Sequence, residues 1–278
     1  MTRKHLVLRT LAIATATVLV AAIGFASIRP SNSRNWTPEH SRLPAITIDG
    51  SEARIENVRD FRTVSPDSLA PGYYDRTYDL EGIETLWFIL SIFNEDEFRG
   101  PAHSAVSFGF EDGTYLTVSV EARKEVGESY SITKGLLKRY ELIYVIGDER
   151  DLIRTRAVFR PDRVYLYPIQ TTKKKIRELF VDMLEAANAL HDRPLFYNTA
   201  TRNCTTVLRD HVNIVTPGLL PHSWKVLLPG YADELLDSLE LLVDSDVPIE
   251  ELRDRHRINE KARAAADDED FSARIRAR

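Results

Sequence analysis

Residues 103–121 read HSAVSFGFEDGTYLTVSVE and describe a β-hairpin with a defined register. Two strand-like runs flank Glu111-Asp112-Gly113, and Gly113 can adopt the left-handed conformation that closes a three-residue hairpin loop. With this loop one face of the pair becomes apolar, and on the other face His103 lies opposite Glu121. Directly opposed side chains have Cβ atoms roughly 4.5–5.5 Å apart, so the hairpin predicts a carboxylate beside a histidine.

The pattern around the hairpin predicts an α+β domain in which an antiparallel sheet packs on helices. Further strand-like runs cover residues 53–58, 73–80, 84–93, 141–146 and 164–169. After residue 171 the apolar residues recur with helical spacing up to Leu190, and Thr171 or Thr172 can cap that helix. A second helix is expected to begin near Cys204 and to end before Pro217, and residues 233–242 are expected to be helical.

The N-terminus predicts a membrane segment. Arg3, Lys4 and Arg9 precede an apolar run over residues 10–28, which is long enough to cross a bilayer as a helix. Secretory apolar regions are shorter, and Gly24-Phe25-Ala26 is a weak cleavage site, so an uncleaved anchor is preferred over a cleaved signal peptide. The basic end is expected to stay in the cytoplasm, which places the rest of the chain outside it.

Composition and charge set the domain plan and exclude some functions. We expect an anchor or uncleaved signal at residues 1–29, a linker at 30–45, an extracytoplasmic thiol-enzyme domain at 46–249 and a charged helical tail at 250–278. A net charge of -5 over 278 residues, without a basic face, does not fit a nucleic-acid binder. One cysteine cannot form an intramolecular disulfide and is too few thiols for a zinc ribbon, so no metal or cofactor is expected.

That cysteine, Cys204, follows a polar loop at the expected start of a helix. Unpaired N–H groups and the helix dipole at such a position stabilise a thiolate, and the same N–H groups can bind an oxyanion. Asn203, Arg202 and Arg123 are expected to support that oxyanion. The alternative is an inert buried cysteine that packs the helix start.

A thiol nucleophile needs a base, and His103 is the best-placed histidine. His211 lies two turns along the helix of Cys204, a rise of roughly 10 Å, which is too far for a hydrogen bond to the thiol. Glu121 would orient the His103 ring and complete a nucleophile–base–orienter set. An exposed cross-strand charge pair is the alternative reading of His103 and Glu121.

Four segments, residues 100–110, 119–125, 140–150 and 196–206, together resemble a bacterial family named after Lnb, an alternative lipoprotein N-acyltransferase. More distantly, a strand histidine that precedes an Asn-Cys helix start is similar to circularly permuted papain-like enzymes, which include NlpC-type amidases and lecithin:retinol acyltransferase. The resemblance implies a permuted papain-like fold and thioester chemistry at Cys204, with His103 as base and a polar residue that orients it. It also implies a periplasmic domain tethered to the bacterial inner membrane.

Three functions follow from these expectations. The first is a thiol acyltransferase that moves a fatty acyl chain from a membrane phospholipid through Cys204 to an amine, which the resemblance identifies as a lipoprotein N-terminus. The second is a cysteine peptidase or amidase that acts on envelope peptides or peptidoglycan. The third is a non-catalytic binding domain of the envelope.

Overall fold

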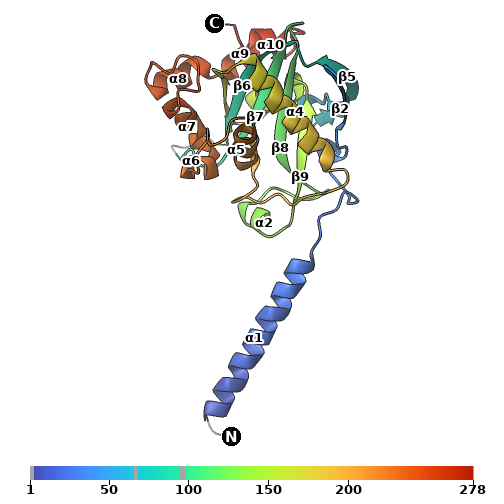
Figure 1. Ribbon diagram of the computed structural model, residues 1–278, viewed down its shortest axis with the longest axis vertical. Coiled ribbons are helices and arrows are strands. Elements are labelled where there is room, and N and C mark those ends of the chain that lie inside the picture. Colours follow the sequence, from blue (N-terminus) through green and yellow to red (C-terminus); the bar gives the residue numbers. More distant parts are fainter. Residues whose placement is uncertain (1–2, 66–67, 94–97, 278) are drawn as a thin grey trace.

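The centre of the domain is a large sheet, seen in a computed structural model that describes residues 3–65, 68–93 and 98–277 (Figure 1). Within these residues the sheet has eight strands, in the order β1-β2-β9-β8-β7-β6-β10, and β5 pairs with β2. The strands are β1 (Ala45–Asp49), β2 (Glu52–Arg59), β5 (Tyr73–Asp79), β6 (Ile83–Ile92), β7 (Ala102–Phe110), β8 (Tyr115–Arg123), β9 (Glu141–Gly147) and β10 (Arg163–Pro168). All pairings are antiparallel except a short parallel contact between β2 and β9. Two further strands, β3 (Arg62–Ser65) and β4 (Ser68–Ala70), pair with each other.

The central hairpin has the predicted register. Val106 of β7 faces Val118 of β8, and Ser107 faces Thr117. Gly113 closes the loop with a φ of 80°, in the left-handed region that glycine adopts without strain. The local turn chemistry therefore sets which side chains share each face of the sheet.

Two long helices cover one face (Figure 1): α4 (Lys173–Ala189) and α5 (Cys204–Val215). The Thr172 side chain caps α4 as predicted, by accepting a hydrogen bond from the backbone N–H of Lys175. The apolar stripe of α4 packs on the even-numbered residues of the hairpin, and the rings of Phe180 and Phe108 have centroids 4.7 Å apart. The predicted fold class, an α+β domain with a sheet packed on helices, is confirmed.

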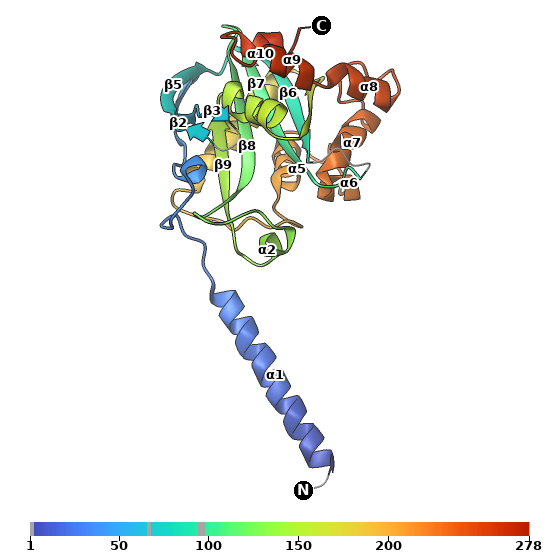
Figure 2. The same ribbon diagram turned by 180° about the vertical axis from the view of Figure 1, so that it is seen from behind.

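Short helices cover the opposite face (Figure 2). They are α3 (Glu149–Leu152), the π-helix η2 (Thr155–Phe159), α9 (Asn259–Ala264) and α10 (Phe271–Arg274). The charged tail contributes apolar residues here, because Phe271 and Ile275 are buried in a core cluster with Ala105 of β7. Sequence reasoning detected only the charged face of the tail and not the residues that pack.

The remaining helices lie at the margins of the sheet: η1 (Pro38–His40), α2 (Ile132–Leu136), α6 (Trp224–Leu227), η3 (Pro229–Tyr231), α7 (Ala232–Ser238) and α8 (Ile249–His256). The segment expected to be a linker packs against β8. Arg123 donates hydrogen bonds to the carbonyl oxygens of His40 and Ser41 and to the side chain of Asn32, and it lies over the Trp36 ring. These contacts bury His40 at the edge of the sheet.

The helix α1 (Arg3–Ser27) extends away from the domain (Figure 1). Its residues Leu8–Ser27 are long and apolar enough to cross a membrane, and none of that span is buried by the rest of the protein. The predicted apolar N-terminal helix is therefore present as a possible span.

Candidate active site

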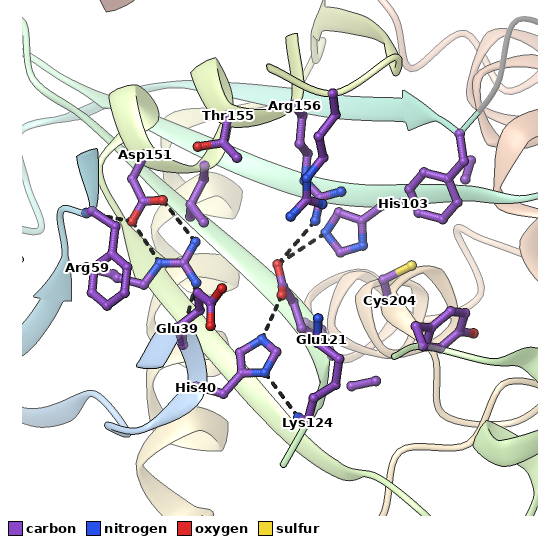
Figure 3. A pocket seen from close by; sticks show the side chains of 18 of the residues that line it. Glu39, His40, Arg59, His103, Glu121, Lys124, Asp151, Thr155, Arg156 and Cys204 are labelled. Carbon is purple, nitrogen blue, oxygen red and sulfur yellow. Dashed lines mark hydrogen bonds and ion pairs between the residues drawn. The ribbon is translucent and has the colours of Figure 1, made fainter. Parts of the chain in front are cut away.

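A cavity of about 450 Å³ opens at the end of the sheet where β7 begins. His103 and Glu121 reach it from the face that carries α3 and η2, and Cys204 reaches it from the start of α5 on the other face. The three predicted reacting residues, 101 positions apart at the extremes, thus line one cavity. Figure 3 shows His103 and Cys204 at the same end of it.

Asn203 fixes the start of α5. Its side-chain oxygen accepts hydrogen bonds from the backbone N–H groups of Thr205 and Thr206, at 2.9 and 2.8 Å, and its amide donates to the carbonyl oxygen of Thr199. The N–H of Val207 bonds the Asn203 carbonyl oxygen. Among the described residues, this leaves the N–H of Cys204 as the first-turn donor without a hydrogen-bond partner.

A serine hydroxyl connects the histidine to the carboxylate. The Nε2 atom of His103 lies 2.7 Å from Oγ of Ser119, and that hydroxyl donates to Oε1 of Glu121 at 2.9 Å. The direct separation of Nε2 and Oε1 is 3.8 Å. Glu121 therefore acts on His103 mainly through Ser119, and the predicted direct pair is lengthened by one hydrogen bond.

These hydrogen bonds assign the tautomer of His103. A hydroxyl has one proton, so if Ser119 donates to the carboxylate it must accept from His103 through an Nε2–H group. Burial and the nearby Arg156 guanidinium lower the pKa of His103 to about 3, although Glu121 opposes them. The ring is then neutral at physiological pH, and Nδ1 keeps an unprotonated lone pair that can take a proton.

Glu121 is held ionised by its neighbours. Burial alone would raise its pKa, but the hydrogen bond from His40 and the charge of Arg156 hold that pKa well below its usual range. Nε2 of His40 lies 3.2 Å from Oε2, and an Arg156 nitrogen lies 3.4 Å from Oε1. Nδ1 of His40 accepts from the backbone N–H of Lys124, so Nε2 carries the proton and donates it to Glu121.

Three predicted supporting residues lie elsewhere or are already engaged. Arg123 is buried beneath the segment 32–41, where burial lowers its pKa to about 10, and it does not line the cavity. Arg202 is exposed and donates to the carbonyl oxygen of Phe196, which stabilises the loop before Cys204. Asn203 uses both ends of its amide to hold the helix start, so it positions Cys204 and its N–H donors.

Sequence reasoning missed Ser119, His40 and Arg156. Ser119 could have been found, because residues two apart on a strand share a face and Ser119 therefore accompanies Glu121. His40 and Arg156 meet Glu121 from 81 and 35 positions away, and no local pattern relates them. Arg156 comes from the π-helix η2, and such helices are frequent at functional sites.

A helix start that presents a thiol, beside a neutral histidine tied to a carboxylate, defines a candidate thiol active site. The model of the Lnb N-terminal periplasmic domain matches residues 70–230, more than half of the chain, and the protein belongs to that family. The matched range contains Cys204, His103, Ser119 and Glu121. Together with α1, it fits a single-pass envelope protein with a periplasmic domain. No curated protein and no solved structure matches the chain, so the permuted papain-like arrangement stays a prediction.

Proposed function

We propose that this protein is a thiol acyltransferase of the bacterial envelope, anchored by α1 with its N-terminus in the cytoplasm, in which Cys204 carries a fatty acyl group taken from a phospholipid. The observation that carries the proposal is the chain of hydrogen bonds from His103 through Ser119 to an ionised Glu121, beside a thiol at a helix start. It gives a neutral base, and the negative charge of Glu121 partly offsets the burial and the Arg156 charge that disfavour its protonated form.

In the first step, Nδ1 of His103 takes the thiol proton while the sulfur of Cys204 attacks the ester carbonyl carbon of the phospholipid. The free N–H of Cys204 donates to the oxyanion that forms. The carbon–oxygen ester bond then breaks, and the departing lysophospholipid oxygen receives the proton from His103. The product on the enzyme is a thioester.

In the second step, an amine attacks the thioester carbonyl and gives its proton to His103. The carbon–sulfur bond breaks, an amide forms, and the proton returns to the Cys204 thiolate. We take this amine to be the N-terminal cysteine of a lipoprotein, as the resemblance to Lnb-type acyltransferases implies. The enzyme ends as it began, so the cycle needs no cofactor.

A second cavity favours a lipid donor. It has a volume of about 100 Å³ and lies under α5, and its lining is mainly leucine and valine side chains. Thr205 lines it, and the Thr205 hydroxyl is 3.7 Å from the sulfur of Cys204. An acyl chain on the sulfur would have apolar surface within one residue of its carbonyl group.

The larger cavity also suits a charged substrate, which keeps a cysteine amidase as the second candidate. Four cationic side chains line it against three carboxylates: Arg59, Lys124, Arg156 and Arg160 against Glu39, Glu121 and Asp151. A phospholipid headgroup carries the phosphate that such a surplus attracts, and a peptidoglycan stem carries carboxylates. A non-catalytic binding domain is the third candidate.

The experiment is to incubate the full chain with vesicles of one defined phospholipid and to measure the intact mass. We expect a gain of one acyl chain on the wild type, released by hydroxylamine, and none on Cys204→Ser. Cleavage of peptidoglycan fragments without an acyl adduct would favour the amidase. A chain with neither activity, whose thiol is alkylated no faster than free cysteine, would be a binding domain.

A further inference from the structure

Exposed apolar side chains gather around α2, on the segment of residues 126–139. Val126, Ile132, Leu136 and Leu137 are 58%, 53%, 44% and 56% exposed. Tyr130 is 42% exposed, and Leu195 of a neighbouring loop is 40% exposed. A soluble domain rarely leaves so many large apolar groups together in water, and such a patch marks an interaction surface.

The position of the patch identifies what covers it. The helix α2 lies at the end of the domain nearest α1 (Figures 1 and 2). Lys138, two residues after α2, donates through Nζ to the carbonyl oxygen of Phe25 at 3.2 Å and lies over the Phe25 ring. Phe25 is two residues from the end of the candidate span, which is about 3 Å of helix rise. Where α1 leaves a bilayer, α2 must therefore lie at its surface.

The charges around the patch fit the same partner. Lys134 and Arg139 are exposed beside the apolar residues, and Lys138 is half-buried between them and α1. Basic side chains at this depth pair with anionic headgroups, while the neighbouring apolar side chains enter the boundary of the acyl layer. A protein partner would not require the contact to Phe25.

The patch is joined to the nucleophile by short contacts. The Thr199 hydroxyl donates to the carbonyl oxygen of Ile132, and the Thr199 N–H donates to that of Gly135. A side chain at Gly135 would collide with the Thr199 hydroxyl, since an added Cβ would lie 2.1 Å from it. Thr199 in turn accepts from Asn203, the residue that caps the helix of Cys204.

We propose that residues 126–139 are a membrane-docking surface that enters the headgroup region of the bilayer crossed by α1 and seats the cavity on the lipid. Tyr130 belongs to both, because it is exposed in the patch and lines the cavity with Cys204. A lipid would reach the thiol without crossing water. The inference rests on α1 as a membrane span and not on acyl transfer.

The test measures the depth of single nitroxide labels on the full chain in nanodiscs of phosphatidylethanolamine and phosphatidylglycerol. In a Cys204→Ser background the label is placed by Leu136→Cys, with Leu137→Cys as a second site. Val18→Cys, in α1, is the lipid reference, and Lys174→Cys, at the exposed start of α4, is the water reference. The readout is the accessibility of the label to oxygen relative to a water-soluble nickel chelate.

We expect an oxygen-to-nickel ratio at positions 136 and 137 that is several-fold higher than at 174 and lower than at position 18, which lies in the middle of the span. A ratio at 136 and 137 equal to that at 174, with position 18 in lipid, overturns the docking surface and leaves the anchor intact. If the label at position 18 is exposed to water, both the docking surface and the α1 anchor are overturned. Shielding of 136 only in native membranes, and not in nanodiscs, would mean that a protein covers the patch.

Discussion

Two carboxylates lie against the same face of the β7–β8 hairpin, Glu149 of α3 and Glu121 of β8. Each accepts hydrogen bonds from a serine and an arginine, but only Glu121 belongs to the candidate site. Glu149 accepts a hydrogen bond from the Ser107 hydroxyl of β7 and two hydrogen bonds from the Arg276 guanidinium. Glu121 accepts a hydrogen bond from the Ser119 hydroxyl of β8 and a longer hydrogen bond from the Arg156 guanidinium. Both are serine–carboxylate–arginine clusters, and their serines are two positions apart in the register, since Ser107 faces Thr117 and Ser119 faces Ala105.

They differ in what lies on the far side of the serine. Beyond Ser107 the site is closed, and the Glu149 side chain is 0% exposed. Beyond Ser119 stands His103, then a cavity with Cys204, and Glu121 also accepts from His40. The comparison shows that a buried ionic cluster becomes a candidate catalytic device when its hydrogen bonds end on a group that can exchange a proton.

The largest effect is expected when the proton acceptor beside the Glu121 cluster, His103, is removed. His103→Gln should lower the rate of Cys204 acylation about 10²- to 10⁴-fold, the usual contribution of a positioned base. The measurement is the initial rate of thioester formation by mass spectrometry. His222→Gln, an exposed histidine bonded to Arg209, is the matched control and should keep the wild-type rate. A His103→Gln protein as fast as that control would remove the assignment of the base.

Breaking the Glu149 cluster should lower the stability of the fold and leave the rate of Cys204 acylation unchanged. Arg276→Ala leaves Glu149 buried without its ion partner, which should lower the free energy of unfolding by about 3–5 kcal/mol. It also removes the packing of the guanidinium over Tyr115. Thermal unfolding should shift by on the order of 10 °C, with the acylation rate per folded molecule unchanged. An unshifted transition would show that the tail does not hold Glu149.

Acid should lower the stability of the protein through the Glu121 cluster and its two histidines. The folded pKa values of His103 and His40 lie below 6.5 and that of Glu121 below 4.5, so the folded state binds fewer protons than the unfolded state. Stability should therefore be fully present above pH 6.5 and fall as the pH drops toward 3. Denaturant titrations from pH 8 to pH 4 measure this slope, and His103→Gln should flatten it. A slope that is identical in that variant would mean that folding does not lower the pKa of His103.

Much of this arrangement was predictable because it is local. The hairpin register follows from one loop with Gly113, and the start of α5 follows from a polar loop that gives way to helical spacing. The register predicted His103 opposite Glu121, but the ladder pairs extend only to Ala105 and Ser119. Beyond these pairs the side-chain rotamers set the contacts, and the Ser119 hydroxyl lies between the His103 ring and the Glu121 carboxylate.

The rest depends on contacts over long separations. His40 reaches Glu121 only because Arg123 and Trp36 fix residues 32–41 on β8. Arg156 reaches it from a helix whose place is set by the second core, to which Phe271 and Ile275 contribute. A sequence pattern does not reveal either of these long-range contacts, so sequence reasoning treated His40 as a linker residue and residues 250–278 as a charged helical tail.

The most direct test of the account compares the two serines, Ser119→Ala and Ser107→Ala, through the alkylation of Cys204 by iodoacetamide between pH 5 and pH 8. The chain has a single cysteine, so every alkylation event reports on that thiol. Ser119→Ala should slow the reaction about tenfold at neutral pH and displace its pH profile, since a hydrogen bond to a charged group contributes about 1.5 kcal/mol. Ser119→Thr should restore the rate, and Ser107→Ala should match the wild type. Equal rates and pH profiles in all of these proteins would contradict the claim that Glu121 acts on Cys204 through Ser119 and His103.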